Sequence, residues 1–121
     1  MTLVGVDITE IWRIAYMVER WEGRFLDRIY TKDELTYCRA RYPQLAARFA
    51  SKEAVMKLLG TGRYGVSWKE IEVSRDRGRA PRIKLHGRAL SRAEKLKIKE
   101  ISISISHARD YAVAFVMGET E

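Results

Sequence analysis

The alternation of apolar and polar positions along the chain predicts helices in its first half and strands in its second. Residues 3–8 are mostly apolar and rich in β-branched residues, which is typical of a buried strand. Apolar residues then recur at helical spacing over 11–18, and either Asp7 or Thr9 is suited to cap that helix. The chain is therefore expected to begin with a strand that leads directly into a helix.

Two more helices are predicted before the glycine-rich segment that starts at Gly60. Thr31 and Glu34 have the spacing of a capping box, which opens a short helix expected to end at about Arg41. Pro43 suits the first turn of a longer helix, which we expect to end at the Leu59–Gly60 boundary.

The second half of the chain has mainly the period-two pattern of strands. Short strands are predicted over 71–73 and 81–86, and a basic helix over 87–99. Isoleucine alternates with serine over 101–106, and 111–117 is the expected hairpin partner. This order indicates an α+β fold in which N-terminal helices pack on a small, mainly antiparallel sheet.

The composition is that of an ordinary globular protein. The chain has 121 residues, 46% of them hydrophobic and 32% charged, and we expect one domain over residues 1–121. No apolar run approaches the roughly 18 residues of a membrane span, and the N-terminus lacks a secretory signal pattern. The single cysteine, Cys38, fits a reducing compartment, so a cytoplasmic location is expected.

The charge indicates an anionic partner. A net charge of +7 favours binding of nucleic acid, a phosphorylated ligand or an acidic protein, without choosing among them. A nucleic-acid-binding module has no support beyond charge, because the chain has no aromatic sheet motif, Gly-x-x-Gly clamp or recognisable reading helix. We therefore expect no nucleic-acid partner and no membrane partner.

Two charged residues interrupt the apolar face of the long helix. Leu45, Phe49 and Met56 fall on one stripe at helical spacing, and Lys52 and Glu53 fall within the same stripe. A charge that faces a core must be paired, coordinated or neutralised. A salt bridge and a functional site both remain open for these two residues.

Asp7 is a third charge in an unexpected place, at the end of the first buried strand. It could cap the following helix, with Glu10 as the reciprocal partner. Together with Glu53, however, it would supply two hard oxygen ligands of the kind that Mg²⁺ prefers. The spacing alone does not show that the two side chains meet.

Weaker signals surround these acidic residues. Gly60, Thr61 and Gly62 offer backbone N–H groups near Lys57, and such groups can cradle phosphate, although Gly60 also suits a helix C-cap. His107 follows the serine-rich strand at a turn. Other basic residues form two groups, each of which could also be a solvated face. They are Arg41, Arg48 and Lys52 on one side, and Arg13, Arg20, Arg24 and Arg28 near the N-terminal helices.

Four segments in this order carry a family resemblance. They are Gly5–Thr9, Arg48–Ala54, Lys57–Gly62 and Ser104–His107. With them the chain resembles the bacterial holo-acyl-carrier-protein synthases, the short class of 4′-phosphopantetheinyl transferases. The resemblance implies that fold, and transfer of phosphopantetheine from coenzyme A to a serine of apo acyl carrier protein. The second product would be adenosine 3′,5′-bisphosphate, and the pathway fatty acid biosynthesis.

The resemblance also implies roles for individual residues. Asp7 and Glu53 would bind Mg²⁺, and Glu53, directly or through a metal-bound water, would accept the proton of the serine. Arg48 and His107 would bind the adenosine-side phosphate of coenzyme A. The full set expected to contact coenzyme A is Arg48, Lys52, Lys57, Gly60, Thr61, Gly62 and His107. The arginines expected to dock the acidic carrier protein are Arg13, Arg20, Arg24 and Arg28. The family is further expected to form homotrimers with active sites shared between subunits.

Overall fold

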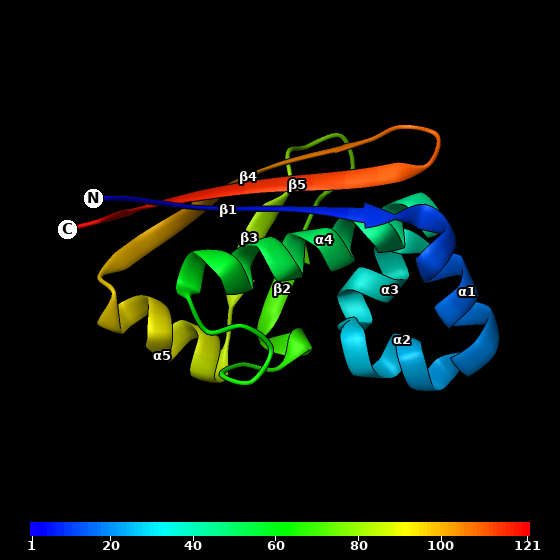
Figure 1. Ribbon diagram of the computed structural model, residues 1–121, viewed down its shortest axis with the longest axis horizontal. Coiled ribbons are helices and arrows are strands. Elements are labelled where there is room, and N and C mark those ends of the chain that lie inside the picture. Colours follow the sequence, from blue (N-terminus) through cyan, green and yellow to red (C-terminus); the bar gives the residue numbers. More distant parts are fainter.

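The structure of the chain is a computed structural model that describes residues 1–121. It has five helices, five strands and one short 3-10 helix (Figure 1). In chain order these are β1 (Thr2–Glu10), α1 (Ile11–Trp21), α2 (Gly23–Ile29), α3 (Lys32–Cys38), α4 (Tyr42–Leu59), η1 (Trp68–Glu70), β2 (Ile71–Ser74), β3 (Arg82–Leu85), α5 (Gly87–Lys95), β4 (Ile98–His107) and β5 (Tyr111–Thr120).

The main sheet joins the two ends of the chain. Its strand order is β1-β5-β4, and both pairings are antiparallel. Ala114 of the central strand β5 pairs with Asp7 of β1 on one side and with Ile105 of β4 on the other. The predicted hairpin of the serine-rich strand with its successor is therefore confirmed. The first strand also enters this sheet, so the N- and C-termini lie side by side at one end (Figure 1).

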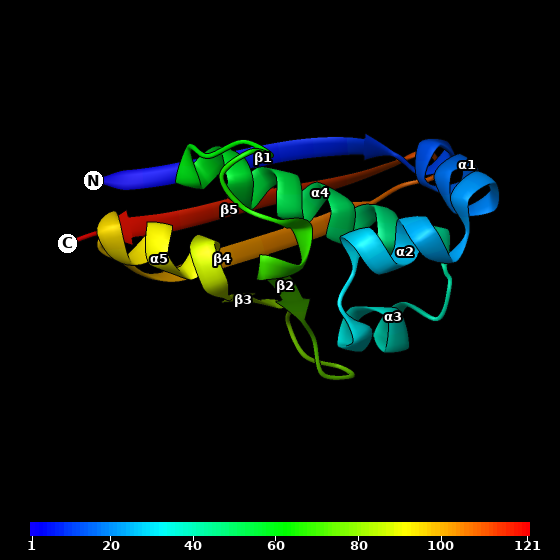
Figure 2. The same ribbon diagram turned by 90° about the horizontal axis from the view of Figure 1, so that it is seen from below.

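Helix α4 lies along the inner face of this sheet, with α1 to α3 at one end and α5 at the other (Figures 1 and 2). Small residues permit close contact, since Ala50 and Ala54 share a core cluster with Ala114 and Val116 of β5. Strand β2 and η1 contact another side of the helix. As a result α4 is buried on nearly all sides, so its buried surface extends beyond the one apolar stripe expected from the sequence.

Three other boundaries differ from the expected ones. No side chain of Asp7 or Thr9 caps α1, because β1 continues through both residues and Glu10 occupies the N-cap position without a side-chain hydrogen bond. The helix opened by the Thr31 capping box, which is present, ends at Cys38. It ends there because the next two residues adopt positive φ. Likewise α5 ends at Lys95, and Lys97 turns the chain at a φ of 62° into β4.

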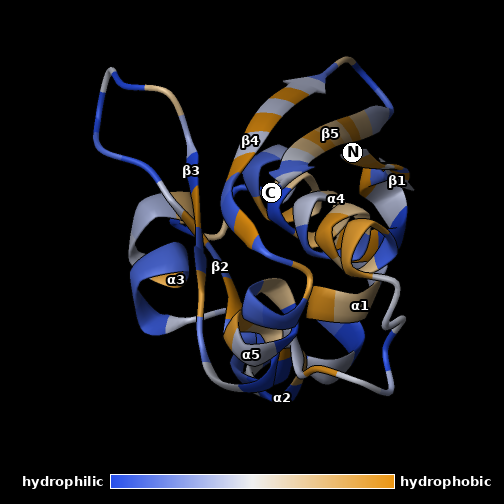
Figure 3. Cartoon of the chain, turned by 90° about the vertical axis from the view of Figure 1, so that its left-hand side faces the viewer, coloured by the Kyte–Doolittle hydropathy of each residue, from blue (hydrophilic) through white to orange (hydrophobic).

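The outer face of the main sheet is apolar but exposed. Inward residues such as Ala112, Ala114 and Val116 are fully buried, while their neighbours on β5 are exposed on the outer face. On β4, hydrophobic and polar residues alternate along the strand (Figure 3). The exposed apolar side chains on this face are Val4, Val6, Ile8, Val113, Phe115 and Met117. An α+β class with helices packed on an antiparallel sheet is thus confirmed. None of the helices is long and apolar enough to cross a membrane.

Candidate functional site

A close crossing of β1 over α4 brings Asp7 beside Glu53. A Cβ atom added to Gly5 would lie 2.0 Å from the carbonyl oxygen of Ala54, so only glycine permits this distance between strand and helix. Asp7 lies two residues further along the same inward face of β1, and Glu53 precedes Ala54 on α4. The Gly-x-Asp and Lys-Glu-Ala segments are thus two sides of one backbone contact.

Two side chains hold Asp7 at the edge of this contact. Lys57, one turn after Glu53 on α4, places its ammonium 3.1 Å from Oδ1 of Asp7 and 2.9 Å from the carbonyl oxygen of Val6. The hydroxyl of Thr9 donates to Oδ2 at 3.2 Å. The Asp7 side chain keeps 12% of its surface exposed, which leaves its carboxylate open to a ligand.

Glu53 has a perturbed environment. Burial raises the pKa of its carboxyl group, and the negative charge of Asp7 raises this pKa further, while Arg63, Lys57 and Arg13 oppose the shift. Arg63 makes the direct contact, with Nη2 3.3 Å from Oε1. Two carboxylates that repel one another beside solvent form a site that a cation would stabilise.

The donor set fits a hard divalent cation. Asp7 and Glu53 are the two acidic residues present, and no third His, Cys, Asp or Glu joins them in a potential metal-binding group. Mg²⁺ is commonly held by one or two carboxylates, with water and substrate phosphate as the remaining ligands. The two side chains are partly exposed, so such ligands have access.

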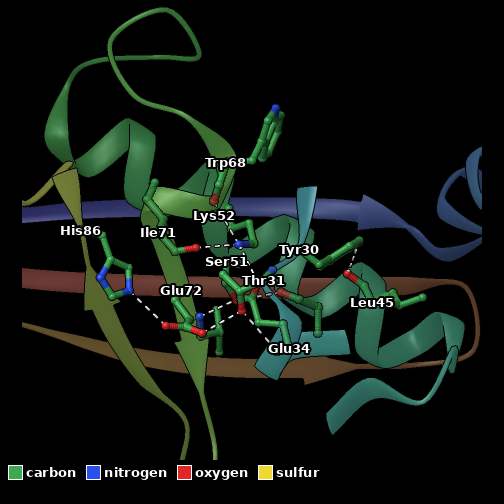
Figure 4. Close-up of polar contacts among 12 residues, drawn as sticks. Tyr30, Thr31, Glu34, Leu45, Ser51, Lys52, Trp68, Ile71, Glu72 and His86 are labelled. Carbon is green, nitrogen blue, oxygen red and sulfur yellow. Dashed lines mark hydrogen bonds and ion pairs between the residues drawn. The ribbon is translucent and has the colours of Figure 1, made fainter. Parts of the chain in front are cut away.

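Lys52, the neighbour of Glu53, lies in a different environment. Its ammonium is 2.8 Å from Oε1 of Glu34, and neither side chain has any exposed surface (Figure 4). It also donates to the carbonyl oxygens of Trp68 at 3.0 Å and Ile71 at 2.6 Å, which uses its three donors. The structure therefore shows the salt bridge that the sequence left open, and the prediction that Lys52 contacts coenzyme A is withdrawn.

The glycine loop is only partly available to a ligand. Gly60 takes the left-handed C-cap conformation, and its N–H donates to the carbonyl oxygens of Lys57 and Met56. The N–H of Thr61 also donates to Met56, while that of Gly62 has no backbone partner. The first two amides are thus engaged in ending α4, and of the predicted phosphate cradle the N–H of Gly62 and the side chain of Lys57 remain.

Arg48 and His107 meet at a second hollow. They line a cavity of about 320 Å³ with Tyr37 and Arg75. The Arg48 guanidinium lies 4.6 Å from the Tyr37 ring centroid and is 2% exposed, yet its Nε and Nη2 atoms have no hydrogen-bond partner. Because buried donors are nearly always satisfied, these two atoms are suited to an anionic ligand entering from the cavity.

The four arginines near the N-terminal helices are all exposed and lie in two places. Arg20 and Arg24 lie 5.1 and 6.0 Å from the ring centroid of Trp21. Arg13 and Arg28 line a cleft of about 920 Å³ that is mostly apolar and also includes Arg63. Since Arg63 contacts Glu53, this cleft adjoins the acidic pair.

Sequence reasoning missed three residues that the structure adds to these sites. Arg63 contacts Glu53, and Tyr37 and Arg75 join Arg48 and His107. None lies in a periodic pattern or a short motif, so no local signal identified them. The excess of basic residues in the composition was the only indication of Arg63 and Arg75, and no signal indicated Tyr37.

The chain belongs to the 4′-phosphopantetheinyl transferase superfamily. The family model for that superfamily matches residues 3–116. Within it, the chain is 44% identical to the holo-[acyl-carrier-protein] synthase of Halothermothrix orenii, over 96% of this chain and 95% of that protein. It is 47% identical to the synthase of Dehalococcoides mccartyi, over 98% and 99%.

Solved structures agree with the sequence comparison. The holo-[acyl-carrier-protein] synthase of Helicobacter pylori, crystallised in complex with coenzyme A, has a TM-score of 0.88 and 32% identity, covering 97% of this chain and 100% of that one. The synthase of Neisseria meningitidis has a TM-score of 0.85 and 36% identity, covering 98% of both chains. The predicted resemblance, fold and enzyme class are therefore confirmed.

Proposed function

We propose that this protein transfers the 4′-phosphopantetheine group of coenzyme A to a serine of an apo acyl carrier protein. The observation that carries the proposal is the Asp7–Glu53 pair at the edge of an arginine-lined cleft, in a member of this superfamily. The serine oxygen bonds to the phosphorus that carries pantetheine. The bond from that phosphorus to the bridging oxygen breaks, and adenosine 3′,5′-bisphosphate leaves with the electron pair.

Asp7 and Glu53 hold Mg²⁺ in this proposal. The metal, when bound, supplies positive charge that stabilises the diphosphate and the leaving phosphate. Lys57 lies against Asp7 and donates hydrogen bonds to the same phosphates, together with the N–H of Gly62. Glu53, directly or through a metal-bound water, accepts the proton of the serine.

The adenosine end binds at Arg48 and His107. The 3′-phosphate of coenzyme A is a compact anion, and the unpartnered Nε and Nη2 atoms of Arg48 offer two donors to it. Arg48 and Glu53 are five residues apart on α4, which separates them by about 140° around the helix. Arg48 lines the cavity that holds His107, whereas the cleft next to Glu53 does not include Arg48. One ligand therefore uses these two groups from neighbouring copies.

A homotrimer with shared sites fits the exposed apolar sheet face. Three rows of cross-strand partners from β1, β5 and β4 lie on this face: Val4–Met117–Ser102, Val6–Phe115–Ser104 and Ile8–Val113–Ser106. Contiguous apolar surface of this kind is typical of an interface between subunits. The face lies on β1, the strand that also carries Asp7, so its burial between copies would bring a neighbour close to the acidic pair.

The acidic carrier protein docks on α1 and α2. Arg13 and Arg28 line the cleft next to Glu53, and Arg20 and Arg24 extend the positive surface.

The reaction serves fatty acid biosynthesis in the cytoplasm, where the free thiol of Cys38 is stable.

Intact-mass measurement of an apo acyl carrier protein tests the function. After incubation with this protein, coenzyme A and Mg²⁺, the carrier is expected to gain the mass of one phosphopantetheine group. Glu53→Gln should abolish this gain, and chelation of the metal should do the same. Absence of the adduct on every apo carrier tried would contradict the proposal.

Charge reversal tests the docking surface. Arg13→Glu should weaken carrier binding at least tenfold and leave coenzyme A binding nearly unchanged. Lys95→Glu is the matched control, because Lys95 is exposed on α5 at the other end of the molecule (Figure 2). Equal losses for the two ligands, or for the two variants, would refute this assignment.

A further inference from the structure

Arg63 connects the acidic pair with the neighbouring cleft. It lies in the loop between α4 and η1, between Gly62, whose φ is +59°, and Gly65. Its guanidinium contacts Oε1 of Glu53 at 3.3 Å and lies 5.7 Å from the ring centroid of Trp68. The side chain is 64% exposed, so it is free to leave this position without opening the core.

The charges around the site are balanced in the absence of a metal. Asp7 and Glu53 contribute two negative charges, and Lys57 and Arg63 contribute two positive ones in direct contact with them. The two cations are held unequally. Lys57 also donates to a backbone carbonyl, whereas Glu53 is the only hydrogen-bonding partner of Arg63. Of the two, Arg63 is the more easily displaced.

We propose that Arg63 is a displaceable counter-ion of Glu53, which occupies this carboxylate in the free protein and is moved off it when a divalent cation binds. This inference rests on the metal site of the proposed function. A guanidinium and a dication compete for the same oxygen and repel one another. Once displaced, Arg63 remains in the cleft as a free cation facing the anionic substrates, and the acidic pair with its metal and both basic residues carries a net charge of +2.

Metal affinity tests the competition directly. We expect Arg63→Gln to bind Mn²⁺ about twofold to fivefold more tightly than the parent protein, measured by the electron paramagnetic resonance signal of free Mn²⁺ without coenzyme A. Arg88→Gln is the first control, since Arg88 lines the same cleft but pairs with Glu70, and its affinity should not change. Arg13→Gln is the second, because Arg13 faces Glu53 without forming an ion pair with it. If Arg13→Gln and Arg63→Gln increase Mn²⁺ affinity equally, the cause is the change in overall charge, and the proposal is overturned.

Fluorescence of Trp68 tests the movement. In a Trp12→Phe, Trp21→Phe background, Trp68 is the sole tryptophan. Mg²⁺ should change its emission while Arg63 is present, and should no longer do so after Arg63→Gln. If the parent binds Mn²⁺ and Arg63→Gln binds it equally well, or if both proteins give the same emission change, only the Arg63 inference fails. If the parent binds neither ion, the metal site of the proposed function fails and this inference falls with it.

Discussion

The ammonium of Lys52 lies 2.8 Å from the carboxylate of Glu34, and both side chains are completely buried. Glu34 also accepts from the backbone N–H groups of Thr31 and Val73, so this pair ties α3, α4 and β2 together (Figure 4). Burial lowers the pKa of Lys52, and Glu34 opposes that shift. The pair holds the turn of α4 that carries Glu53, and it does so without presenting any atom to a substrate.

Removing one partner of this pair should be strongly destabilising. Lys52→Met leaves the Glu34 carboxylate buried and unpaired, which we expect to reduce the free energy of unfolding by about 3–5 kcal/mol. Urea denaturation followed by circular dichroism measures the loss. The double variant Glu34→Gln, Lys52→Met removes both charges and should recover part of it. A double variant less stable than Lys52→Met would show that the isolated carboxylate is not the source of the cost.

A methyl group at position 5 should separate the two halves of the acidic pair. The Cβ atom of Gly5→Ala would overlap the carbonyl oxygen of Ala54, so β1 must move away from α4. We expect a loss of about 1–3 kcal/mol in stability and a weaker affinity for Mn²⁺. Gly23→Ala is the control, because a Cβ atom there meets nothing within 4 Å. Equal metal affinity in Gly5→Ala and the parent would contradict the link between this glycine and the site.

Local patterns predicted the elements whose signals lie within a few residues. The isoleucine and serine alternation of β4, the Thr31 capping box and the limits of α4 at Pro43 and Gly60 all match the structure. The pairing of β1 with β5 was not predicted, because strands about one hundred residues apart leave no joint periodic signal. For the same reason the sequence indicated only one apolar stripe on α4, although β2 and η1 also contact the helix.

The candidate site was predicted by residue type and family resemblance, and its geometry was not. Asp7 and Glu53 stood out as charges in apolar segments, but their meeting depends on the crossing at Gly5, which is a tertiary contact. Lys52 stood out by the same criterion and proved to be paired with Glu34. A charge within an apolar stripe therefore identifies a residue that needs a partner, and the sequence does not reveal whether that partner is another side chain or a ligand.

Replacement of Glu53 should raise stability while it removes activity. Because burial and Asp7 raise the pKa of Glu53, the folded state holds its proton to a higher pH than the unfolded state. Ionisation of Glu53 therefore costs stability as pH rises through that pKa, and Glu53→Gln avoids this cost. We expect a higher melting temperature for Glu53→Gln at pH 7 without metal, and no difference at a pH where the carboxyl group is protonated in both states. Mg²⁺ should reduce the difference in melting temperature between the variant and the parent at pH 7. A lower melting temperature for the variant without metal would contradict the upward direction of the Glu53 pKa shift.

Arg48 should be needed for the 3′-phosphate and not for folding. Arg48→Met is expected to raise KM for coenzyme A about tenfold to a hundredfold, with little change for dephospho-coenzyme A, which lacks that phosphate. The melting temperature of the variant should not fall, because the substitution removes two guanidinium nitrogens that are buried without a hydrogen-bond partner. Arg41→Met is the matched control, since Arg41 lies 5.7 Å from the same Tyr37 ring and donates to the carbonyl oxygens of Cys38 and Tyr37. An equal rise in KM for both coenzymes would refute the assignment.

A charge on the outer face of the main sheet should dissociate the assembly and the activity together. Phe115 is at the centre of that face, between Val6 and Ser104, and is 45% exposed in the single chain. Phe115→Glu would place a carboxylate in the proposed apolar interface, so light scattering after size exclusion should give the mass of one subunit. The control is Leu90→Glu on α5, where a leucine that is 43% exposed lies away from the sheet face and the mass should not change. In the proposed shared site Arg48 and Glu53 act from neighbouring copies, so the monomer should keep its fold and lose turnover, and an active monomer would contradict the shared site.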